Sequence, residues 1–267
     1  MKKEDILFNI ITRTHNRPNL FKRCVDSIRN HRFKNIHHVV TYQNDKDLEY
    51  INKYKIDNTT VVPVPYVRKL KGVWFDRDGH YVEHAPYNTF FNIAHKYVKK
   101  GWIIYIDDDD VLADHKALDV VADHILKFKD EDRSIIAPTN YLNQYYMPNH
   151  EYLNYYASGK ELEQGQIAMQ GFIFHSKNVD KMVFDEWAFG DLYTFKNYEK
   201  HIFNRYILNF PVVYQPKRGM GYNSDSYDRI NEGDLVFKNK HVTEIIKLPK
   251  LVLPKLKLSN PDLDEKV

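Results

Sequence analysis

The chain has little cysteine and no long hydrophobic segment, and both absences narrow what it can be. Its 267 residues include a single cysteine, Cys24, so no disulfide can form within the chain and a cysteine-rich zinc module does not fit. No run of about 18 apolar residues occurs, and the first dozen residues lack the apolar stretch of a signal peptide. We therefore expect a cytoplasmic protein that does not cross a membrane.

An excess of one charge sign is also missing. Lys and Arg total 39 against 36 for Asp and Glu, and a net charge of +3 is too small to predict a nucleic-acid partner. The sequence also lacks the short motifs of zinc proteases, serine hydrolases, P-loop proteins and dinucleotide-binding proteins. With 43% hydrophobic residues, the chain is globular and long enough for one large domain.

Apolar runs alternate with helix-like segments along the chain. Strands are expected at 6–12, 36–42, 59–64, 102–106, 134–138, 167–175 and 210–216. Helices are expected between them, beginning at Pro18 and then over 47–55, 87–98, 118–125 and 192–206. This order predicts an α/β fold in which helices flank a mixed, mainly parallel central sheet.

Four consecutive aspartates, Asp107 to Asp110, follow the apolar run at 102–106. An unbroken apolar run is typical of a strand buried on both faces, and the carboxyl end of such a strand opens into the ligand crevice of an α/β sheet. Two carboxylates about 4 Å apart repel by about 4 kcal/mol at an effective dielectric near 20. Because Mg²⁺ and Mn²⁺ bind carboxylates together with phosphate oxygens, we expect a metal site here. The alternative is a solvated loop in which Asp110 caps the next helix.

Two segments, NIITRTHNRPNLFKRCVDSI and NIAHKYVKKGWIIYIDDDDVL, resemble the family 2 type of nucleotide-sugar-dependent glycosyltransferases with the GT-A fold. The resemblance covers about residues 6–216 and implies a Rossmann-like GT-A domain over residues 1–235. Its donor-binding half would extend to about residue 112 and its acceptor-binding half over about 113–235. A basic tail at 236–267 follows, and its lysines interleaved with leucines could contact an anionic membrane or pack on the domain, although its prolines oppose one continuous amphipathic helix.

The resemblance implies that the loop after the first strand cradles the nucleotide. In this chain the loop contributes Thr14, Asn16 and Arg17. The planar guanidinium of Arg17 matches a diphosphate, although an exposed arginine near a helix start is the alternative. Asn88 and Asn92, ahead of the aspartates, are further candidates for facing the donor; the alternative for both is a helix cap or an exposed polar residue.

The aspartates correspond to the DxD motif of the family. Asp107 and Asp109 are the expected pair, with one contacting the ribose side of the nucleotide and the other the metal, and both are predicted ligands of Mn²⁺ or Mg²⁺. Asp108 and Asp110 are second choices, and Asp108 is also expected to contact the nucleotide sugar.

The base of the donor is less firmly implied. UDP is the usual donor nucleotide of the family, which places an acidic residue at the end of the second strand to contact the base. Here the nearest position is Thr41, and the next acid is Asp45.

Transfer with inversion needs a general base that takes the proton of the acceptor hydroxyl. The resemblance places this base in FDEWAFGDLYTF, where Asp191 is the first choice and Asp185 the reserve. Asp191 is also placed to cap a helix that begins at Leu192, and both roles can coexist. Gln170, on the preceding strand, would border the acceptor and the donor sugar.

The sequence thus predicts a metal-dependent, inverting hexosyl- or deoxyhexosyl-transferase that moves a sugar from a nucleotide diphosphate sugar to a glycan or glycolipid hydroxyl. A nucleotidyltransferase, or a catalytically silent glycan-binding or assembly protein of the same fold, stays open as an alternative. Two other sets complete the hypothesis. Arg68, Lys69 and Lys71 are candidates for a basic lid over the donor phosphates, and a mobile solvated loop is the alternative. A stacking wall for the acceptor could be formed by Tyr141, Tyr145, Tyr146, Tyr155 and Tyr156, and ordinary packing is the alternative.

Overall fold

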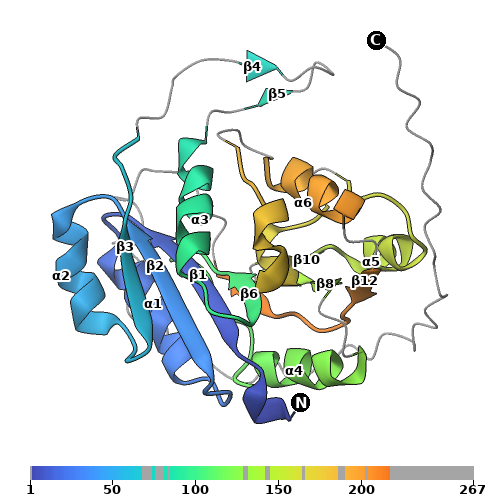
Figure 1. The fold of residues 1–267 in the computed structure, drawn as a ribbon, viewed down its shortest axis with the longest axis horizontal. Helices are drawn as coiled ribbons and strands as arrows, with labels where there is room; N and C mark the ends of the chain where they lie inside the picture. Colours follow the sequence, from blue (N-terminus) through green and yellow to red (C-terminus); the bar gives the residue numbers. More distant parts are fainter. Residues whose placement is uncertain are drawn as a thin grey trace.

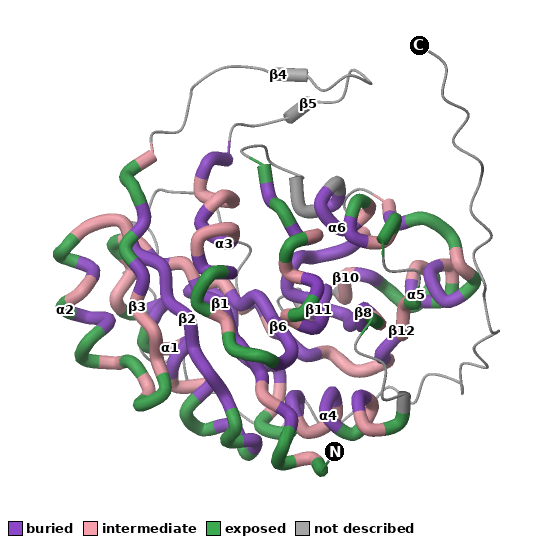
Figure 2. The backbone as a smooth tube through the Cα atoms, in the orientation of Figure 1, coloured by how far each residue is buried: buried purple, intermediate pink, exposed green. Residues whose placement is uncertain are grey.

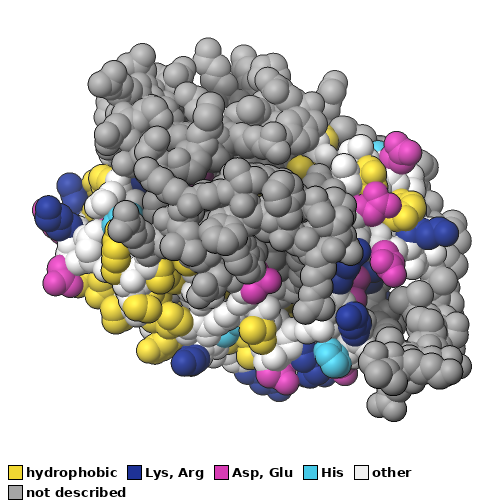
Figure 3. All heavy atoms as spheres, turned by 90° about the horizontal axis from the view of Figure 1, so that it is seen from above, with side chains coloured by type: hydrophobic (Ala, Val, Ile, Leu, Met, Phe, Trp, Pro, Cys, Tyr) yellow, Lys and Arg dark blue, Asp and Glu magenta, His cyan; other side chains and the backbone are white. Residues whose placement is uncertain are grey.

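The computed structural model describes residues 2–67, 74–75, 81–82, 85–128, 132–141, 145–163, 166–185, 190–201 and 204–216. Within these ranges no helix has the length and apolar character that crossing a membrane would require. The predicted lid at 68–71 and the tail at 236–267 lie outside the described residues. Among the side chains that are coloured in Figure 3, acidic and basic groups are interspersed.

A seven-stranded sheet runs through the middle of the molecule (Figure 1). Its strands are β1 (Phe8–Thr14), β2 (Ile36–Tyr42), β3 (Thr59–Pro63), β6 (Trp102–Tyr105), β8 (Arg133–Ile136), β11 (Phe172–His175) and β12 (Asn204–Ile207). The order across the sheet is β12-β8-β11-β6-β1-β2-β3. Neighbours are parallel except at β11, which is antiparallel to both β6 and β8. The predicted α/β fold with a mixed, mainly parallel sheet is confirmed.

Helices cover both faces of this sheet (Figure 1). One face carries α3 (Thr89–Ala94), α5 (His150–Ala157) and α6 (Gly190–His201); the other carries α1 (Pro18–Arg29) and α4 (Ala117–Phe128), and α2 (Asp45–Tyr54) packs beside α1. Successive residues of β6 point to opposite faces, so Ile103 joins one core while Ile104 joins the other. Figure 2 shows the central strands as almost continuously buried.

Smaller elements complete the fold. A four-stranded sheet has the order β10-β9-β13-β7, and β4 pairs with β5 in an antiparallel ribbon. The bounds of these strands are β4 (Trp74–Phe75), β5 (Tyr81–Val82), β7 (Val111–Leu112), β9 (Thr139–Tyr141), β10 (Tyr145–Met147) and β13 (Val213–Gln215). Short 3₁₀ turns are η1 (Lys3–Asp5), η2 (Pro86–Asn88), η3 (His95–Tyr97), η4 (Met169–Gly171) and η5 (Ser176–Lys181).

Three expected elements differ from those observed. The helix expected over 192–206 ends at His201, because residues from Asn204 pair with β8 as strand β12. The helix expected over 87–98 is divided into η2, α3 and η3. The strand expected over 167–175 begins only at Phe172, after η4. The backbone at Gly171 lies close to the backbone at Ala137, because a Cβ on Gly171 would lie 2.3 Å from the carbonyl oxygen of Ala137. The position therefore requires glycine.

Candidate active site

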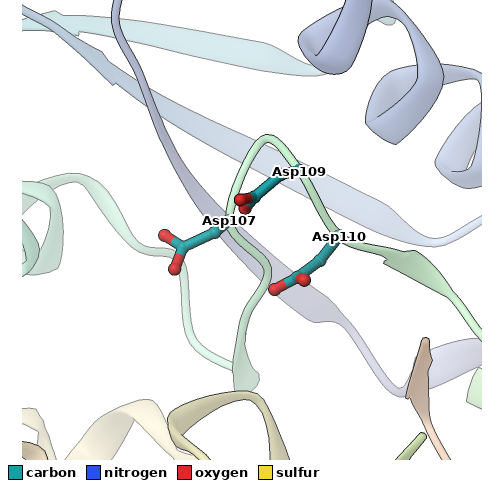
Figure 4. Close-up of side chains that lie close together, drawn as sticks. All are labelled: Asp107, Asp109 and Asp110. Atoms are coloured by element: carbon teal, nitrogen blue, oxygen red, sulfur yellow. The ribbon is translucent and has the colours of Figure 1, made fainter. Parts of the chain in front are cut away.

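The four aspartates lie in the loop that joins the carboxyl end of β6 to β7. The loop closes on itself through a hydrogen bond from the amide of Asp110 to the carbonyl of Asp107, at 2.9 Å. Carboxylate oxygens of Asp107, Asp109 and Asp110 all lie within 4.8 Å of one another, and Figure 4 shows the three side chains close together at the loop. The loop therefore gathers three of the four carboxylates into one cluster.

Asp110 is the most enclosed member of this cluster. It is fully buried, and its Oδ2 accepts a hydrogen bond from Nε2 of Gln170 at 2.7 Å. Gln215, a buried residue of β13, is a second side-chain hydrogen-bond partner of this carboxyl. Burial, and then the negative charges of Asp109 and Asp107, raise the pKa of Asp110 well above its ordinary value.

Asp107 is paired with an arginine that the sequence analysis missed. Nε of Arg13 donates to Oδ1 of Asp107 at 2.7 Å, and Nη2 donates to Oδ2 at 3.1 Å. Nη1 of the same guanidinium donates to Oδ1 of Asn88 at 3.0 Å. A signal was present, because β1 and β6 are parallel and Ile11 pairs with Tyr105, so Arg13 comes level with Asp107 two residues later.

Asp108 is held in a pocket of its own. Thr14 donates from Oγ1 to Oδ2 of Asp108 at 2.7 Å, and Nη2 of Arg17 lies 2.5 Å from Oδ1. Burial raises the pKa of Asp108 to about 7, although the positive charge of Arg17 opposes that shift. The predicted residues Thr14, Arg17 and Asp108 are therefore brought together.

Asp109 shares an arginine with Asp108 and contacts a second one. Nη1 of Arg17 lies 3.3 Å from Oδ2 of Asp109, and Nη2 of Arg23 donates to the carbonyl oxygen of Asp109 at 2.5 Å. Burial raises the pKa of Asp109, again against the effect of Arg17. Arg23 is a second arginine that sequence reasoning did not single out, because the contact spans 86 residues of the chain.

Asn16 shapes the loop that carries Arg17. Its backbone has a φ of 52°, a left-handed conformation that asparagine tolerates better than most residues. Its amide donates to Oδ1 of Asp47 at 2.9 Å, and Asp47 in turn belongs to the capping box that begins α2. Pro18 then occupies the first position of α1, where a missing amide hydrogen costs nothing. The turn thus directs Arg17 toward the aspartates.

The resemblance places an acid that contacts the base at the end of β2. Neither Thr41 nor Asp45 provides a buried carboxylate there. Thr41 is buried within β2, and Asp45 is exposed at the start of α2. The buried acid of this region is Asp47, whose carboxylate is already bonded to Asn16, Asn44 and Tyr50.

Asn92 is engaged away from the aspartate cluster. Its side chain donates to the carbonyl of Phe184 at 2.7 Å and accepts from the amide of Phe184 at 2.9 Å. It therefore fixes the segment that leads to Asp185, which is exposed. Asp191 belongs to the first turn of α6, but its side chain lies outside the described part of the structure, so its role as general base stays a prediction.

Only some of the tyrosines predicted to stack on the acceptor have exposed side-chain surface. Tyr156 is 1% exposed, with the guanidinium of Arg205 5.7 Å from its ring centroid, so it belongs to the core. Tyr146 and Tyr155 are half-buried. The side chains of the two other members, Tyr141 and Tyr145, lie outside the described residues.

The cluster fits a small divalent cation by the chemistry of its ligands. Mg²⁺ and Mn²⁺ prefer carboxylate oxygens, and Asp107, Asp109 and Asp110 place such oxygens within reach of one ion. Asp110 is fully buried and its side-chain partners Gln170 and Gln215 are both neutral, so a cation would compensate the charge of its carboxylate.

Comparison with known proteins supports the fold. No protein-family model matches the sequence, and no curated protein matches it. Solved structures do match: TarS 1-349 from S. aureus with UDP-GlcNAc, at 15% identity and a TM-score of 0.58, covers 83% of this chain and 61% of its own. The mannosyltransferase PcManGT from Pyrobaculum calidifontis with GDP-Man and Mn²⁺, at 13% identity and a TM-score of 0.54, covers 82% of this chain and 60% of its own.

A third match is glucosyl-3-phosphoglycerate synthase from Mycobacterium tuberculosis in complex with Mn²⁺, UDP and glucosyl-3-phosphoglycerate. It is 11% identical, has a TM-score of 0.52, and covers 81% of this chain and 74% of its own. The chain thus spans about three fifths of the TarS 1-349 and PcManGT structures. The predicted GT-A fold is confirmed.

Proposed function

We propose that the protein is a metal-dependent glycosyltransferase that moves a hexose or deoxyhexose from a nucleotide diphosphate sugar to a hydroxyl of a glycan or glycolipid. The observation that carries this proposal is the cluster of Asp107, Asp109 and Asp110 at the carboxyl end of β6. Structures of the same fold hold GDP-Man with Mn²⁺ and UDP with Mn²⁺, which supports a nucleotide donor and a divalent ion for this chain.

The residues around the cluster divide the work of binding a donor. Thr14 and Arg17 fix Asp108, and the Arg17 side chain, which is 27% exposed, also lies beside Asp109, where its planar fork can pair with phosphate oxygens. A divalent ion bound by the carboxylates would supply positive charge beside the leaving diphosphate. Gln170 holds the carboxylate of Asp110 from the β11 side of the sheet.

Asp191 is the proposed general base. Its carboxylate would take the proton of the acceptor hydroxyl as that oxygen forms a bond to the anomeric carbon. The bond from the anomeric carbon to the nucleotide diphosphate breaks in the same step, and attack from the opposite face inverts the configuration. The position of Asp191 in the first turn of α6 supports the proposal, because a carboxylate is favoured near a helix N-terminus.

A melting-temperature panel tests this function. UDP, GDP and their sugar derivatives are added to the protein with and without Mn²⁺, because a ligand that binds only the folded state raises its melting temperature. We expect a shift for a nucleotide sugar only when Mn²⁺ is present, and no such shift for Asp109→Asn. The matched control is Asp123→Asn, which removes an aspartate on α4 whose side chain is 56% exposed.

Product analysis then separates the alternatives. Release of a nucleoside diphosphate with transfer of the sugar supports the proposal, and the anomeric configuration of the product tests inversion. Release of pyrophosphate from a nucleoside triphosphate would indicate a nucleotidyltransferase. Metal-dependent binding without turnover of any donor and acceptor tried would indicate a binding or assembly protein.

A further inference from the structure

Asp47 is a fully buried acid at the start of α2, to which the proposed function gives no role. Each of its carboxylate oxygens accepts two hydrogen bonds. Oδ1 accepts from the amide of Asn16 at 2.9 Å and from the hydroxyl of Tyr50 at 3.1 Å. Oδ2 accepts from Nδ1 of His15 at 3.2 Å and from the amide of Asn44 at 3.3 Å. Because a carboxylate has about four acceptor positions, these bonds use the capacity that a ligand would need.

Two routes connect this carboxylate to the loop between β1 and α1. The first is the bond to the amide of Asn16, and the residue that follows Asn16 is Arg17. The second passes through Tyr50, whose hydroxyl lies 3.0 Å from Oγ1 of Thr14, and Thr14 donates from this atom to Asp108 at 2.7 Å. Both routes therefore end at residues that the proposed function places around the donor.

The turn at Asn16 requires an anchor. A φ of 52° is unfavourable for a residue with a side chain, so the turn persists only where its surroundings hold it. The amide of Asn16 donates to a charged acceptor, and such a bond is stronger than one between neutral groups. Burial opposes the charge of Asp47, but hydrogen bonds from His15 and from the amide of Asn16 lower its pKa below the ordinary value. The anchor is therefore a carboxylate that stays charged at neutral pH.

We infer that Asp47 is a positioning residue, which fixes the turn at Asn16 and thereby holds Arg17 where it can bind the diphosphate of the donor. This inference rests on the proposed function, because it names the group that orients one of the phosphate contacts. The carboxylate acts from α2, outside the aspartate loop, and contacts the donor only through Arg17. Asn16 takes part through its backbone.

Nucleotide affinity of the full chain tests this role. UDP and GDP are titrated with Mn²⁺ present by isothermal titration calorimetry, and the nucleotide that the unmodified protein binds more tightly is used for the variants. Asp47→Asn replaces one accepting oxygen by a group that only donates, so bonds on one side of the carboxylate are lost. We expect its dissociation constant to rise by about tenfold or more. Glu49→Gln, which removes an exposed acid from the same helix, should stay within about twofold.

A double-mutant cycle shows whether Asp47 acts through Arg17. Arg17→Gln removes the guanidinium and should also weaken binding by about tenfold or more. If Asp47 only places that guanidinium, Asp47→Asn/Arg17→Gln should bind within about twofold of Arg17→Gln alone. Losses that multiply to about 100-fold in the double variant would overturn the inference. Unchanged binding by Arg17→Gln would overturn it as well.

Loss of the helix cap is separated from loss of the anchor by Asn44→Ala. This variant removes the side-chain oxygen that accepts from the amide of Asp47, and it keeps the bonds from the Asp47 carboxylate to Asn16 and Tyr50. We expect a lower melting temperature, with nucleotide affinity within about twofold of the unmodified protein. Binding as weak as that of Asp47→Asn would assign both effects to general destabilisation and would overturn the inference.

Two variants of Asn16 keep the inference testable if Asp47→Asn does not fold. Asn16→Gly and Asn16→Val both lack the asparagine side chain and keep the amide, but only glycine adopts a φ of 52° freely. Asn16→Val should bind at least about fivefold more weakly than Asn16→Gly, and equal binding would overturn the inference. Unmodified protein that binds neither UDP nor GDP with Mn²⁺ would overturn the proposed function and the inference together. Binding that Asp47→Asn leaves unchanged would overturn the inference alone.

Discussion

Two regions of the central sheet differ in chemistry: the charged side, at the carboxyl ends of β1 and β6, and the aromatic side, around β11. At the ends of β1 and β6, charged side chains pair in a shielded place, and burial raises the pKa of Asp108, Asp109 and Asp110. Around β11, the interior is aromatic, and Phe172 stacks on Phe195 with ring centroids 4.3 Å apart. Buried carboxyls of raised pKa cost stability at neutral pH, whereas packed rings contribute it. Stability and ligand binding should therefore respond to different mutations.

The largest expected effect is on the aromatic side. Phe172→Ala removes a fully buried ring that contacts Phe174, Phe195 and Tyr198. We expect the free energy of unfolding, measured by urea titration, to fall by about 3–5 kcal/mol. The control Val183→Ala, at a residue that is 62% exposed, should change it by less than about 0.5 kcal/mol. Equal losses for the two variants would contradict the comparison.

A slightly smaller effect is expected at the ion pair on the same side. Nε of Arg205 donates to Oε1 of Glu199 at 2.8 Å, and the two side chains are 11% and 15% exposed. Arg205→Met leaves Glu199 without this partner and should lower the free energy of unfolding by about 3 kcal/mol. Adding Glu199→Gln should restore most of the loss. A double variant no more stable than the single one would assign the effect to lost packing instead.

On the charged side, Asp109→Asn tests whether the aspartate contributes to activity and not to stability. If Asp109 binds the ion, kcat/KM for sugar transfer should fall by about 100-fold or more, which corresponds to about 2.7 kcal/mol in the barrier. The melting temperature without metal should stay the same or rise, because the substitution removes a charge that burial disfavours. A variant that loses activity together with stability would indicate that Asp109 has a structural role.

The smallest effect concerns pH. Burial lowers the pKa of His38 to about 3, so its folded form resists a proton that the unfolded chain accepts below about pH 6.5. Stability from His38 is therefore present above that pH and is lost as the pH falls, by about 2 kcal/mol at pH 5. Asp108 acts in the opposite direction, since its pKa is raised to about 7 and protonation favours its folded form.

The contribution of His38 is thus measured as a difference. Urea titrations at pH 7 and pH 5 should show that His38→Asn lacks about 2 kcal/mol of the acid loss seen in the unmodified protein. The exposed His201→Asn should keep the full loss. Identical pH profiles for His38→Asn and the unmodified protein would contradict the prediction.

Much of the order of elements and the place of the aspartates could be predicted from the sequence, because both depend on local patterns, but β9, β10 and α5 were not predicted. The apolar run ahead of Asp107 is strand β6, and Pro18 begins α1 as expected. The partners of the aspartates were harder, since they depend on which strands become neighbours. The hydrogen bond from Gln170 to Asp110 joins residues 60 positions apart, and no local pattern predicts it. Strand β12 was missed because its pairing with β8 overrides the helical pattern.

The reversed direction of β11 has a consequence for communication across the molecule. Because β11 is antiparallel to β6, it enters the sheet at the edge where β6 leaves it, and η4 comes to lie beside the aspartate loop. A single side-chain amide, on Gln170, joins the two. Any displacement of the chain ahead of Phe172 would therefore be transmitted through this amide to the Asp110 carboxyl and to the other carboxylates of its loop.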